Sequence, residues 1–363
     1  MIGICRTLLA AAFAAALGAG GTVAAQQLTA NEKLYEELFK LPAAEREQRL
    51  IEGARKEGIF ETLPNYTGRL EKLHTDVFRA RYPFLKVNIT DMNSYESLER
   101  VIAEERVGKH LTDSTGFSLP DYWVIKDKNI VARYPTPAVE RVLPQYRNFL
   151  SPDHLWIPQS ISEHGISYNS KMIKPEDAPK DWMDMACNPK FKGQMSLDPA
   201  ETKFLIGIYT MFGKDMEKYR QWIECLGKNE PIVLLGHTTR TMLMIAGDHA
   251  IQGDNFFYLW ESLKAKNPTR VPIMGNYDAP LPVFCGAVLI NKNAARPYSA
   301  ALYSDWILSE ESQEFLYKEF RGPITRQHPF LKGNEQLVIF SYEPPEVAEE
   351  LVNIWRKYIG TQK

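Results

Sequence analysis

Helical patterns and short apolar runs alternate along almost the whole 363-residue chain, and this alternation limits the possible fold more than any other feature. A strand is predicted at 59–63 (IFETL), a helix at 69–82 and a second strand at 86–90 (KVNIT). Alternation of this kind is typical of α/β proteins. The run 283–290 (VFCGAVLI) is apolar on both faces, which predicts a strand in the middle of a sheet. The sequence therefore indicates the α/β class.

Local signals mark where several helices begin and end. Asn93, with Glu96 three residues later, predicts a capping box, and Gly58 and Gly108 predict helix ends. Five prolines stand in the segment 134–158, which is too many for an ordinary helix. We therefore expect this segment to be an extended connection between two lobes.

The first 25 residues resemble a cleavable export signal. Arg6 precedes the apolar run LLAAAFAAAL, and small residues follow as far as Gln26, so cleavage is expected after Ala25. A membrane anchor is the alternative, but the run is short and rich in alanine for a segment that spans a bilayer. The chain that remains is long enough for two domains.

Charge and cysteine content narrow the function classes. Lys and Arg number 43 and Asp and Glu number 45, so the chain is close to neutral, which argues against binding nucleic acid or anionic lipid through charge. Three cysteines follow the signal: Cys187, Cys225 and Cys285. An odd number leaves at least one thiol free. We favour buried unpaired thiols, with a disulfide between Cys187 and Cys225 as the alternative.

Sequence motifs for common catalytic chemistry are absent. The chain contains no GxxxxGK[ST] phosphate loop and no GxSxG nucleophile elbow. Its seven histidines show neither HxH nor HExxH spacing. We therefore expect no enzyme activity, no bound metal and no other cofactor.

Two adjacent aromatic residues, Phe256 and Phe257, stand where a predicted strand, 249–253 (HAIQG), leads into a helical pattern. Strand-to-helix junctions of this kind often carry ligand-binding groups. These two rings, however, offer no polar atom. They either line a binding site or pack in the core.

Several segments resemble family 1 extracellular solute-binding proteins of ABC importers, the group that includes the periplasmic ferric-binding proteins. The segments that carry the resemblance are 52–58 (EGARKEG), 78–90 (FRARYPFLKVNIT), 103–109 (AEERVGK), 165–199, 238–257 and 287–316. Each segment alone is weak evidence. Their order and spacing over nearly the whole chain after the signal make the resemblance specific.

The resemblance implies two α/β lobes of the type II periplasmic binding protein fold, joined by crossing strands, with the ligand in the cleft between them. It places lobe 1 at 26–130 with about 280–325, and lobe 2 at about 131–279 with 326–363. It also implies a monomer that closes around a small-molecule ligand by hinge motion. The partner would be the membrane permease of an ABC importer.

In the ferric-binding relatives a pair of tyrosines holds iron(III) at positions that align with Phe256 and Phe257. A phenyl ring offers no anionic oxygen, so both of these iron ligands are missing here. Tyr258 follows directly, but successive side chains on a helix point about 100° apart, so Tyr258 is not expected to replace them. The resemblance therefore favours a ligand other than iron.

Polar residues on both expected lobes, together with the two rings, are candidates for ligand binding. Hydroxyls and an arginine close to helix N-termini favour an anionic group such as a carboxylate or a phosphate. The candidates are Tyr66, Thr67, Arg69, Ser94, Ser118, Glu201, Thr202, Thr238, Thr239, Arg240, Asp254, Phe256, Phe257 and Tyr277. Other roles stay open for some of them: Thr238 and Thr239 as helix caps, Arg240 as a surface charge, and Glu201 as a first-turn carboxylate.

We therefore expect a periplasmic substrate-binding protein that captures a small polar, anionic organic solute for an ABC importer. One alternative is ferric iron held with a synergistic anion through ligands other than a tyrosine pair. Another is a sensor that presents its bound ligand to a receptor. A third, from another class, is an exported enzyme built on the same fold.

Overall fold

Helices and strands alternate along the part of the chain that the computed structural model describes, which is residues 27–66, 68–199, 201–340 and 342–360. The α-helices are α1 (Ala30–Phe39), α2 (Ala43–Glu57), α3 (Gly68–Arg81), α4 (Ser94–Arg106), α5 (Trp182–Cys187), α6 (Thr202–Met211), α7 (Met216–Lys228), α8 (His237–Ala246), α9 (Phe257–Lys266), α10 (Pro297–Trp306), α11 (Glu310–Lys318) and α12 (Pro345–Tyr358). The strands are β1 (Ile59–Leu63), β2 (Lys86–Ile89), β3 (Ser114–Ser118), β4 (Ile157–Asn169), β5 (Met195–Leu197), β6 (Ile232–Val233), β7 (Ile251–Phe256), β8 (Ile273–Gly275), β9 (Leu281–Ile290), β10 (Gly322–Pro323) and β11 (Leu337–Ile339). Short 3₁₀ helices are η1 (Leu119–Val124), η2 (Pro137–Arg141), η3 (Pro144–Phe149), η4 (Pro175–Asp177) and η5 (Pro189–Phe191). The α/β class is therefore confirmed.

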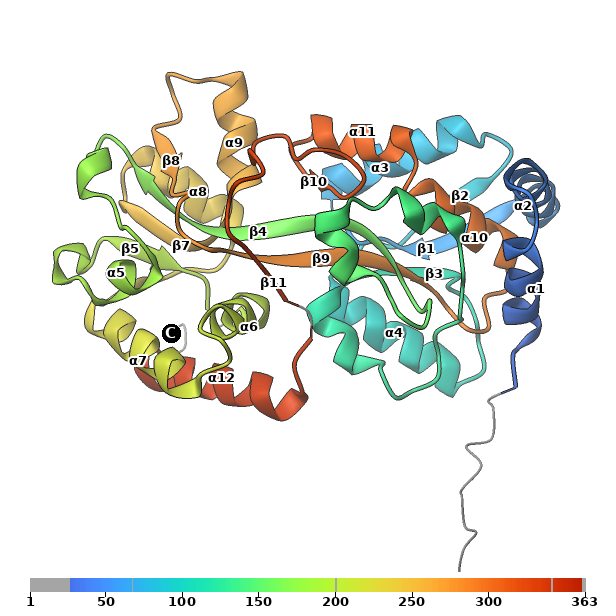
Figure 1. Ribbon diagram of the computed structural model, residues 1–363, viewed down its shortest axis with the longest axis horizontal. Coiled ribbons are helices and arrows are strands. Elements are labelled where there is room, and N and C mark those ends of the chain that lie inside the picture. Colours follow the sequence, from blue (N-terminus) through green and yellow to red (C-terminus); the bar gives the residue numbers. More distant parts are fainter. Residues whose placement is uncertain (1–26, 67, 200, 341, 361–363) are drawn as a thin grey trace, which may run out of the picture.

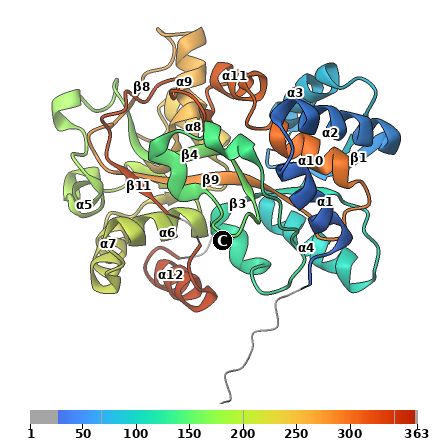
Figure 2. The same cartoon turned by 45° about the vertical axis from the view of Figure 1, so that its right-hand side comes forward.

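Two lobes lie side by side, and strands run from one into the other (Figure 1). The right-hand lobe in that view, which we call lobe 1, contains β1–β3, α1–α4, α10 and α11. The left-hand lobe, lobe 2, contains β5, β7, β8, α5–α9 and α12. The rotated view in Figure 2 keeps α1–α4 well separated from α5 and α7.

One sheet passes through both lobes, in the strand order β2-β1-β3-β9-β4-β7-β5-β6. The strands at each end of this order pair in parallel with their neighbours, whereas β9 and β4 in the middle are antiparallel. The strand β4 changes partner along its length. Its first part, from Ile157 to Glu163, pairs with β9, and its second part, from His164 onward, pairs with β7.

Two clusters of buried apolar side chains hold the fold together. The first fills lobe 1 and continues along the crossing strands as far as Trp260 on α9 and Ile273 on β8. The second lies in lobe 2 among α5, α6, α7 and α12. The apolar residues of the proline-rich segment, from Ala132 to Phe149, pack in the first cluster. The lobe boundaries remain predictions.

Most of the predicted helix signals correspond to the structure. The side chain of Asn93 accepts from the N–H of Glu96 and the Glu96 side chain returns the bond, so the capping box at the start of α4 is confirmed. Gly58 ends α2 in the left-handed conformation, with φ 68°. Two elements are short: β6 contains only Ile232–Val233, and α5 contains only Trp182–Cys187.

The cysteines contradict the interpretation that we favoured from the sequence. Cys187, at the end of α5, forms a disulfide with Cys225 on α7, with 4.7 Å between the two Cα atoms. The helices α5 and α7 pack against each other, which brings together residues that are 38 positions apart. Cys285 on β9 is the buried free thiol. Among the described residues, no helix has the length and apolar content needed to cross a membrane.

Candidate functional site

Groups beside the ends of several strands lie where the two lobes meet. On the lobe 1 side, the turn after β1 carries Tyr66, whose hydroxyl donates to the hydroxyl oxygen of Ser160 on the first part of β4 at 2.6 Å. From lobe 2, Lys203 on α6 reaches Asp121 on η1 of lobe 1, at 3.7 Å. Ligands of α/β proteins bind at such places, beyond the carboxyl ends of strands.

The junction between β7 and α9 separates the two phenylalanines. Phe257 is fully buried, and its ring packs against Gly165, Gly275 and the ring of Tyr277, so it belongs to the core. The ring of Phe256 instead lies 4.7 Å from the rings of both His164 and His237, measured between centroids. The structure therefore places Phe256 at the interlobe contact and Phe257 behind it.

Tyr258 lies beside Phe256, which the sequence argument did not anticipate. The two rings stack with centroids 5.5 Å apart and planes 16° apart. Phe256 is the N-cap of α9 and has an extended backbone (φ −85°, ψ 130°), so the rotation per helical residue does not apply between it and Tyr258. A phenol group therefore stands next to the position of the missing tyrosine pair.

Arg321 reaches this ring from the other lobe. It precedes β10, and its guanidinium carbon lies 3.6 Å from the ring centroid of Tyr258 and 5.5 Å from that of Tyr66. Guanidinium groups over aromatic rings are attracted by the ring quadrupole. Among the described residues, no carboxylate lies within ion-pair distance of Arg321. Its hydrogen-bond donors are therefore available to a bound group.

Glu201, the N-cap of α6, lies between two histidines. Its Oε2 atom is 3.2 Å from Nε2 of His237 and 3.5 Å from Nε2 of His164. Burial raises the pKa of Glu201, but attraction to His237 and contacts with His164 outweigh burial and lower this pKa well below its usual range. Burial lowers the pKa of His237, but the neighbouring Glu201 carboxylate raises it by more, so this pKa lies above its usual value. Glu201 therefore stays ionised, and its Oε2 atom has no hydrogen-bond partner among the described residues.

This pair predicts a specific pH dependence for the variant His237→Gln. The pKa of Glu201 is lowered in the folded protein, so its contribution to stability is complete above about pH 4.5 and is lost as the pH falls. The pKa of His237 is raised, so its contribution is complete below about pH 6.5 and is lost as the pH rises past the raised pKa. Urea unfolding from pH 4 to 9 should therefore show that His237→Gln has a lower free energy of unfolding than the wild-type protein. The difference should be largest, about 1–3 kcal/mol, between about pH 4.5 and pH 6.5. His110→Gln, at a partly exposed ion pair with Glu105, is the control. A deficit that grows steadily up to pH 9 would contradict the assignment.

Arg240 and Asp254 form a buried ion pair and do not face the interlobe contact. Both side chains are fully buried, and the Arg240 guanidinium also lies 3.7 Å from Asp198 and hydrogen-bonds to Nδ1 of His237 at 2.9 Å. Asp254 further accepts from the backbone N–H of Asp198. We expected Arg240 to help hold the anionic group of the ligand at the start of α8, with a surface charge as the alternative. Its donors instead connect α8 to β7 and to the segment after β5.

The remaining candidates have varied positions. Tyr66 and Glu201 have been described above. The N–H of Ser118 donates to the Ser94 hydroxyl at 2.9 Å within lobe 1, and Thr202 is the first residue of α6. Thr238 and Thr239 are exposed in the first turn of α8, and Arg69 is 75 % exposed, 3.9 Å from Glu319. Tyr277 donates to Glu261 and packs on Phe257. Thr67 lies outside the described residues.

The sequence argument missed Tyr258, Arg321, His164 and His237 as members of the site. Within the described residues, no group of three or more His, Cys, Asp or Glu side chains is arranged to hold a metal ion. The contact between Glu201 and the two histidines is electrostatic. Together with Phe256, Tyr258 and Arg321 it forms what we call the solute face.

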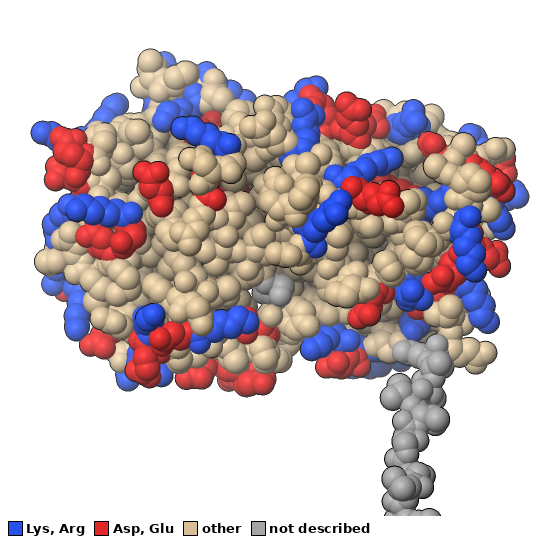
Figure 3. Space-filling view, in the orientation of Figure 1, with Lys and Arg blue, Asp and Glu red and all other residues tan. Residues whose placement is uncertain are grey.

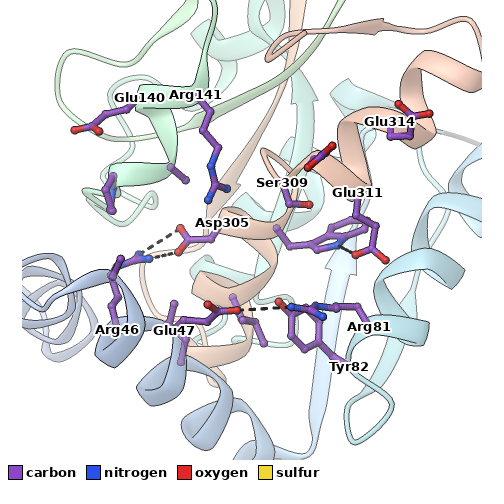
Figure 4. Close-up of a pocket in the computed structure, with 17 residues that line it drawn as sticks. Arg46, Glu47, Arg81, Tyr82, Glu140, Arg141, Asp305, Ser309, Glu311 and Glu314 are labelled. Atoms are coloured by element: carbon purple, nitrogen blue, oxygen red, sulfur yellow. Dashed lines mark hydrogen bonds and ion pairs between the residues drawn. The ribbon is translucent and has the colours of Figure 1, made fainter.

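A cavity of about 860 Å³ lies elsewhere, on lobe 1 between α2, α10 and η2. Its charged groups are largely occupied with one another, because Arg46 pairs with Asp305 and Arg81 lies 3.8 Å from Glu47 (Figure 4). The guanidinium of Arg141 points toward Asp305 in the same view. Groups with free bonding capacity lie instead at the interlobe contact, where Arg321 comes from lobe 1 and Glu201 from lobe 2.

Comparison with known proteins identifies the fold. No protein-family model and no curated protein matches the sequence. Among solved structures, iron-bound HitA from Pseudomonas aeruginosa is similar, with a TM-score of 0.69 and 18% identity over 83% of this chain and 99% of that one. The chain has the periplasmic binding protein fold.

Two further structures with this fold illustrate its range. AfuA from Actinobacillus pleuropneumoniae, a periplasmic binding protein with bound fructose-6-phosphate, has a TM-score of 0.66 and 18% identity, over 83% of this chain and 98% of that one. PotD from Streptococcus pneumoniae, the substrate-binding protein of a spermidine/putrescine ABC transporter, has a TM-score of 0.64 and 16% identity, over 83% of this chain and 97% of that one. The periplasmic binding protein fold thus extends over most of this chain.

Proposed function

We propose that this protein is the substrate-binding protein of an ABC importer and that it captures a small polar, anionic organic solute between its lobes. The observation that carries the proposal is Arg321, which extends from lobe 1 over the Tyr258 ring of lobe 2 without a carboxylate partner among the described residues. Arg321 is a ready anion ligand, because a guanidinium binds carboxylates and phosphates with paired hydrogen bonds.

Helix N-termini on lobe 2 add to the attraction for an anion. Neither α6 nor α8 has a side-chain hydrogen bond at its N-cap, and their first turns meet where Glu201 contacts His237. The first N–H groups of a helix have no partner within the helix and favour a negative group. The carboxylate of Glu201 offers an acceptor for hydroxyl groups of the same solute.

The rings of the solute face suit an organic body. Phe256 and Tyr258 stack on each other, and Phe284 on β9 lies 6.1 Å from Phe256, measured between ring centroids. Figure 3 shows a largely uncharged surface over the middle left of the molecule, next to the junction of the lobes, with side chains of both charges on the right of the junction. An apolar wall with a few polar groups is typical of small-molecule sites.

Iron(III) fits this face less well than an organic anion does. Phe256 and Phe257 provide no oxygen, and Tyr258 supplies a single phenol that stacks on Phe256 beneath the Arg321 guanidinium. Iron(III) prefers several anionic oxygen ligands. HitA, the iron-bound structure with the same fold, is therefore a guide to the architecture of this chain and not to its ligand.

The cellular setting follows from the same proposal. The export signal at 1–25 lies outside the described residues, and we propose that its removal delivers a monomeric protein to the periplasm. There the closed, loaded form would dock on a membrane permease. A solved structure with the same fold is described as the substrate-binding protein of the ABC transporter from Agrobacterium tumefaciens, which supports this partner.

A binding screen tests the proposal. Thermal-shift measurements should compare malate, citrate, glycerol 3-phosphate and glucose 6-phosphate with the uncharged compounds glycerol and glucose. We expect stabilisation by one of the anions. Arg321→Ala should then weaken that binding on the order of tenfold to a hundredfold, because a hydrogen bond to a charged group contributes about 1.5–3 kcal/mol.

Two controls sharpen this result. Arg49→Ala removes a solvent-exposed arginine from α2 and should leave the affinity unchanged. Arg321→Lys keeps the charge but loses the paired donors, so it should bind with intermediate affinity. Tighter binding of an uncharged compound than of any anion, or full affinity in Arg321→Ala, would contradict the proposal.

A further inference from the structure

A buried carboxyl lies directly behind the solute face. Glu163 belongs to β4, next to His164, and its side chain is 1 % exposed. The backbone N–H groups of Phe257 and Tyr258, the first two residues of α9, favour the charged form of this carboxyl and act against the effect of burial on its pKa. These N–H groups have no partner inside the helix. Glu163 therefore lies beside the helical turn that carries Tyr258.

The nearest titratable neighbour of Glu163 is His328, in the segment after β10. Its Nε2 atom lies 3.7 Å from Oε2 of Glu163, and its side chain is 3 % exposed. Its Nδ1 atom accepts from the backbone N–H of Leu331 at 3.4 Å, so the ring proton is on Nε2 and faces the carboxyl. Neither Oε1 of Glu163 nor Nε2 of His328 has a hydrogen-bond partner among the described residues.

The other groups around Glu163 are one cation and two phenols. Arg321 acts on the carboxyl electrostatically from the segment before β10. Tyr146 on η3 and Tyr277 before β9 also interact with it electrostatically, and Glu335 acts on both phenols in the same way. Burial raises the pKa of Tyr146 to about 12 and that of Tyr277 further still, so both stay neutral below pH 9. Arg321 is therefore the cation that a charge on Glu163 would attract.

Both members of the buried pair are uncharged near neutral pH. Burial raises the pKa of Glu163 to about 8 and lowers that of His328 to about 3. Loss of the carboxyl proton to solvent creates a full negative charge close to Arg321. The attraction between two full charges in a poorly solvated place competes with the weaker attraction of the guanidinium for an aromatic ring.

We propose that Glu163 is a positioning residue of the solute face: its ionisation draws the Arg321 guanidinium away from Tyr258, and its protonation returns Arg321 to that ring. The consequence for transport rests on the proposed function, because a bound anion and the Glu163 carboxylate then compete for Arg321. The contact between Arg321 and Tyr258 exists without any solute. It can therefore be tested separately.

The test is a double-mutant cycle on the solute-free protein. Arg321→Ala, Tyr258→Leu and the double variant are compared with the wild-type protein by urea unfolding at pH 6.5 and pH 9, and the same cycle is repeated in a Glu163→Gln background. The coupling between Arg321 and Tyr258 should be favourable at pH 6.5 and largely lost at pH 9. In the Glu163→Gln background, where residue 163 cannot ionise, the coupling between Arg321 and Tyr258 should be equal at pH 6.5 and pH 9.

Glu71→Gln provides the matched control. Burial also raises the pKa of Glu71 to about 8, but its carboxyl contacts Thr75 on α3 and not α9. The coupling in the Glu71→Gln background should keep the pH dependence of the wild-type protein. A pH dependence that persists with Glu163→Gln, or a coupling that is equal at both pH values in the wild-type protein, would overturn the proposal.

A second measurement separates this inference from the proposed function. Sulfate keeps its charge over this pH range, so it is a suitable anionic probe. Its affinity for the wild-type protein should fall by up to tenfold per pH unit above about 8, and this fall should be absent with Glu163→Gln. If the cycle behaves as expected and sulfate does not bind, Glu163 keeps its positioning role and only the anion assignment fails.

Discussion

Arg240→Ala is expected to lower the free energy of unfolding by about 3–5 kcal/mol, because it removes one partner from a fully buried ion pair. Asp254 would be left as a buried, unpaired carboxylate, and Asp198 would lose its neighbouring cation. The sequence alone led us to expect little effect on folding from this change. Urea unfolding at neutral pH measures the loss directly.

The rescue and the control for Arg240 separate charge from packing. Arg240→Met combined with Asp254→Leu replaces the pair by apolar side chains and should recover part of the lost stability. Arg69→Ala, at a side chain that is 75 % exposed, should change the stability by less than about 0.5 kcal/mol. A stability loss below about 1 kcal/mol for Arg240→Ala, together with weakened binding of an anion, would restore its assignment as a ligand residue.

Removal of the Cys187–Cys225 disulfide should cost a comparable amount. The bridge closes a loop with a sequence separation of 38 residues, which corresponds to about 4 kcal/mol of chain entropy in the unfolded state. Cys187→Ser with Cys225→Ser should therefore unfold at markedly lower urea concentration. Wild-type protein unfolded in the presence of dithiothreitol should behave in the same way.

Reductant provides the internal control for the disulfide. Dithiothreitol should have no effect on the double serine variant, because Cys285 is buried and unpaired. Equal stability of the oxidised wild-type protein and the double variant would show that the bridge does not stabilise the fold. Formation of the bridge would also be consistent with export, since disulfides persist in oxidising compartments.

The sequence predicted the architecture because local signals and long-range order agree. The capping box at Asn93, the left-handed Gly58 and the apolar run of β9 each correspond to features of the structure. Local patterns could not reveal that two cysteines meet, because their distance depends on the packing of α5 against α7. The path of the segment 134–158 likewise depends on tertiary contacts that prolines alone do not indicate.

The solute face was only partly predictable, for two physical reasons. The argument against Tyr258 assumed helical geometry, but Phe256 has an extended backbone as the N-cap of α9, which turns Tyr258 to its side. Arg321 comes from the other lobe and is far away in sequence, so no local pattern connects it with the ring. The Thr238–Arg240 segment was recognised as a helix start, yet its charged side chain turns inward to Asp254.

The regular pairing of β4 with β9 between Ser160 and Glu163 limits how this protein can evolve. Side chains of a strand alternate between its two faces, so Ser160 reaches Tyr66 from one face while Glu163 meets His328 from the other. Deleting one residue here would exchange the two faces at once and turn a buried carboxyl toward the solute. New solute preferences in related proteins should therefore arise by substitution along this strand, with changes of length confined to surface loops.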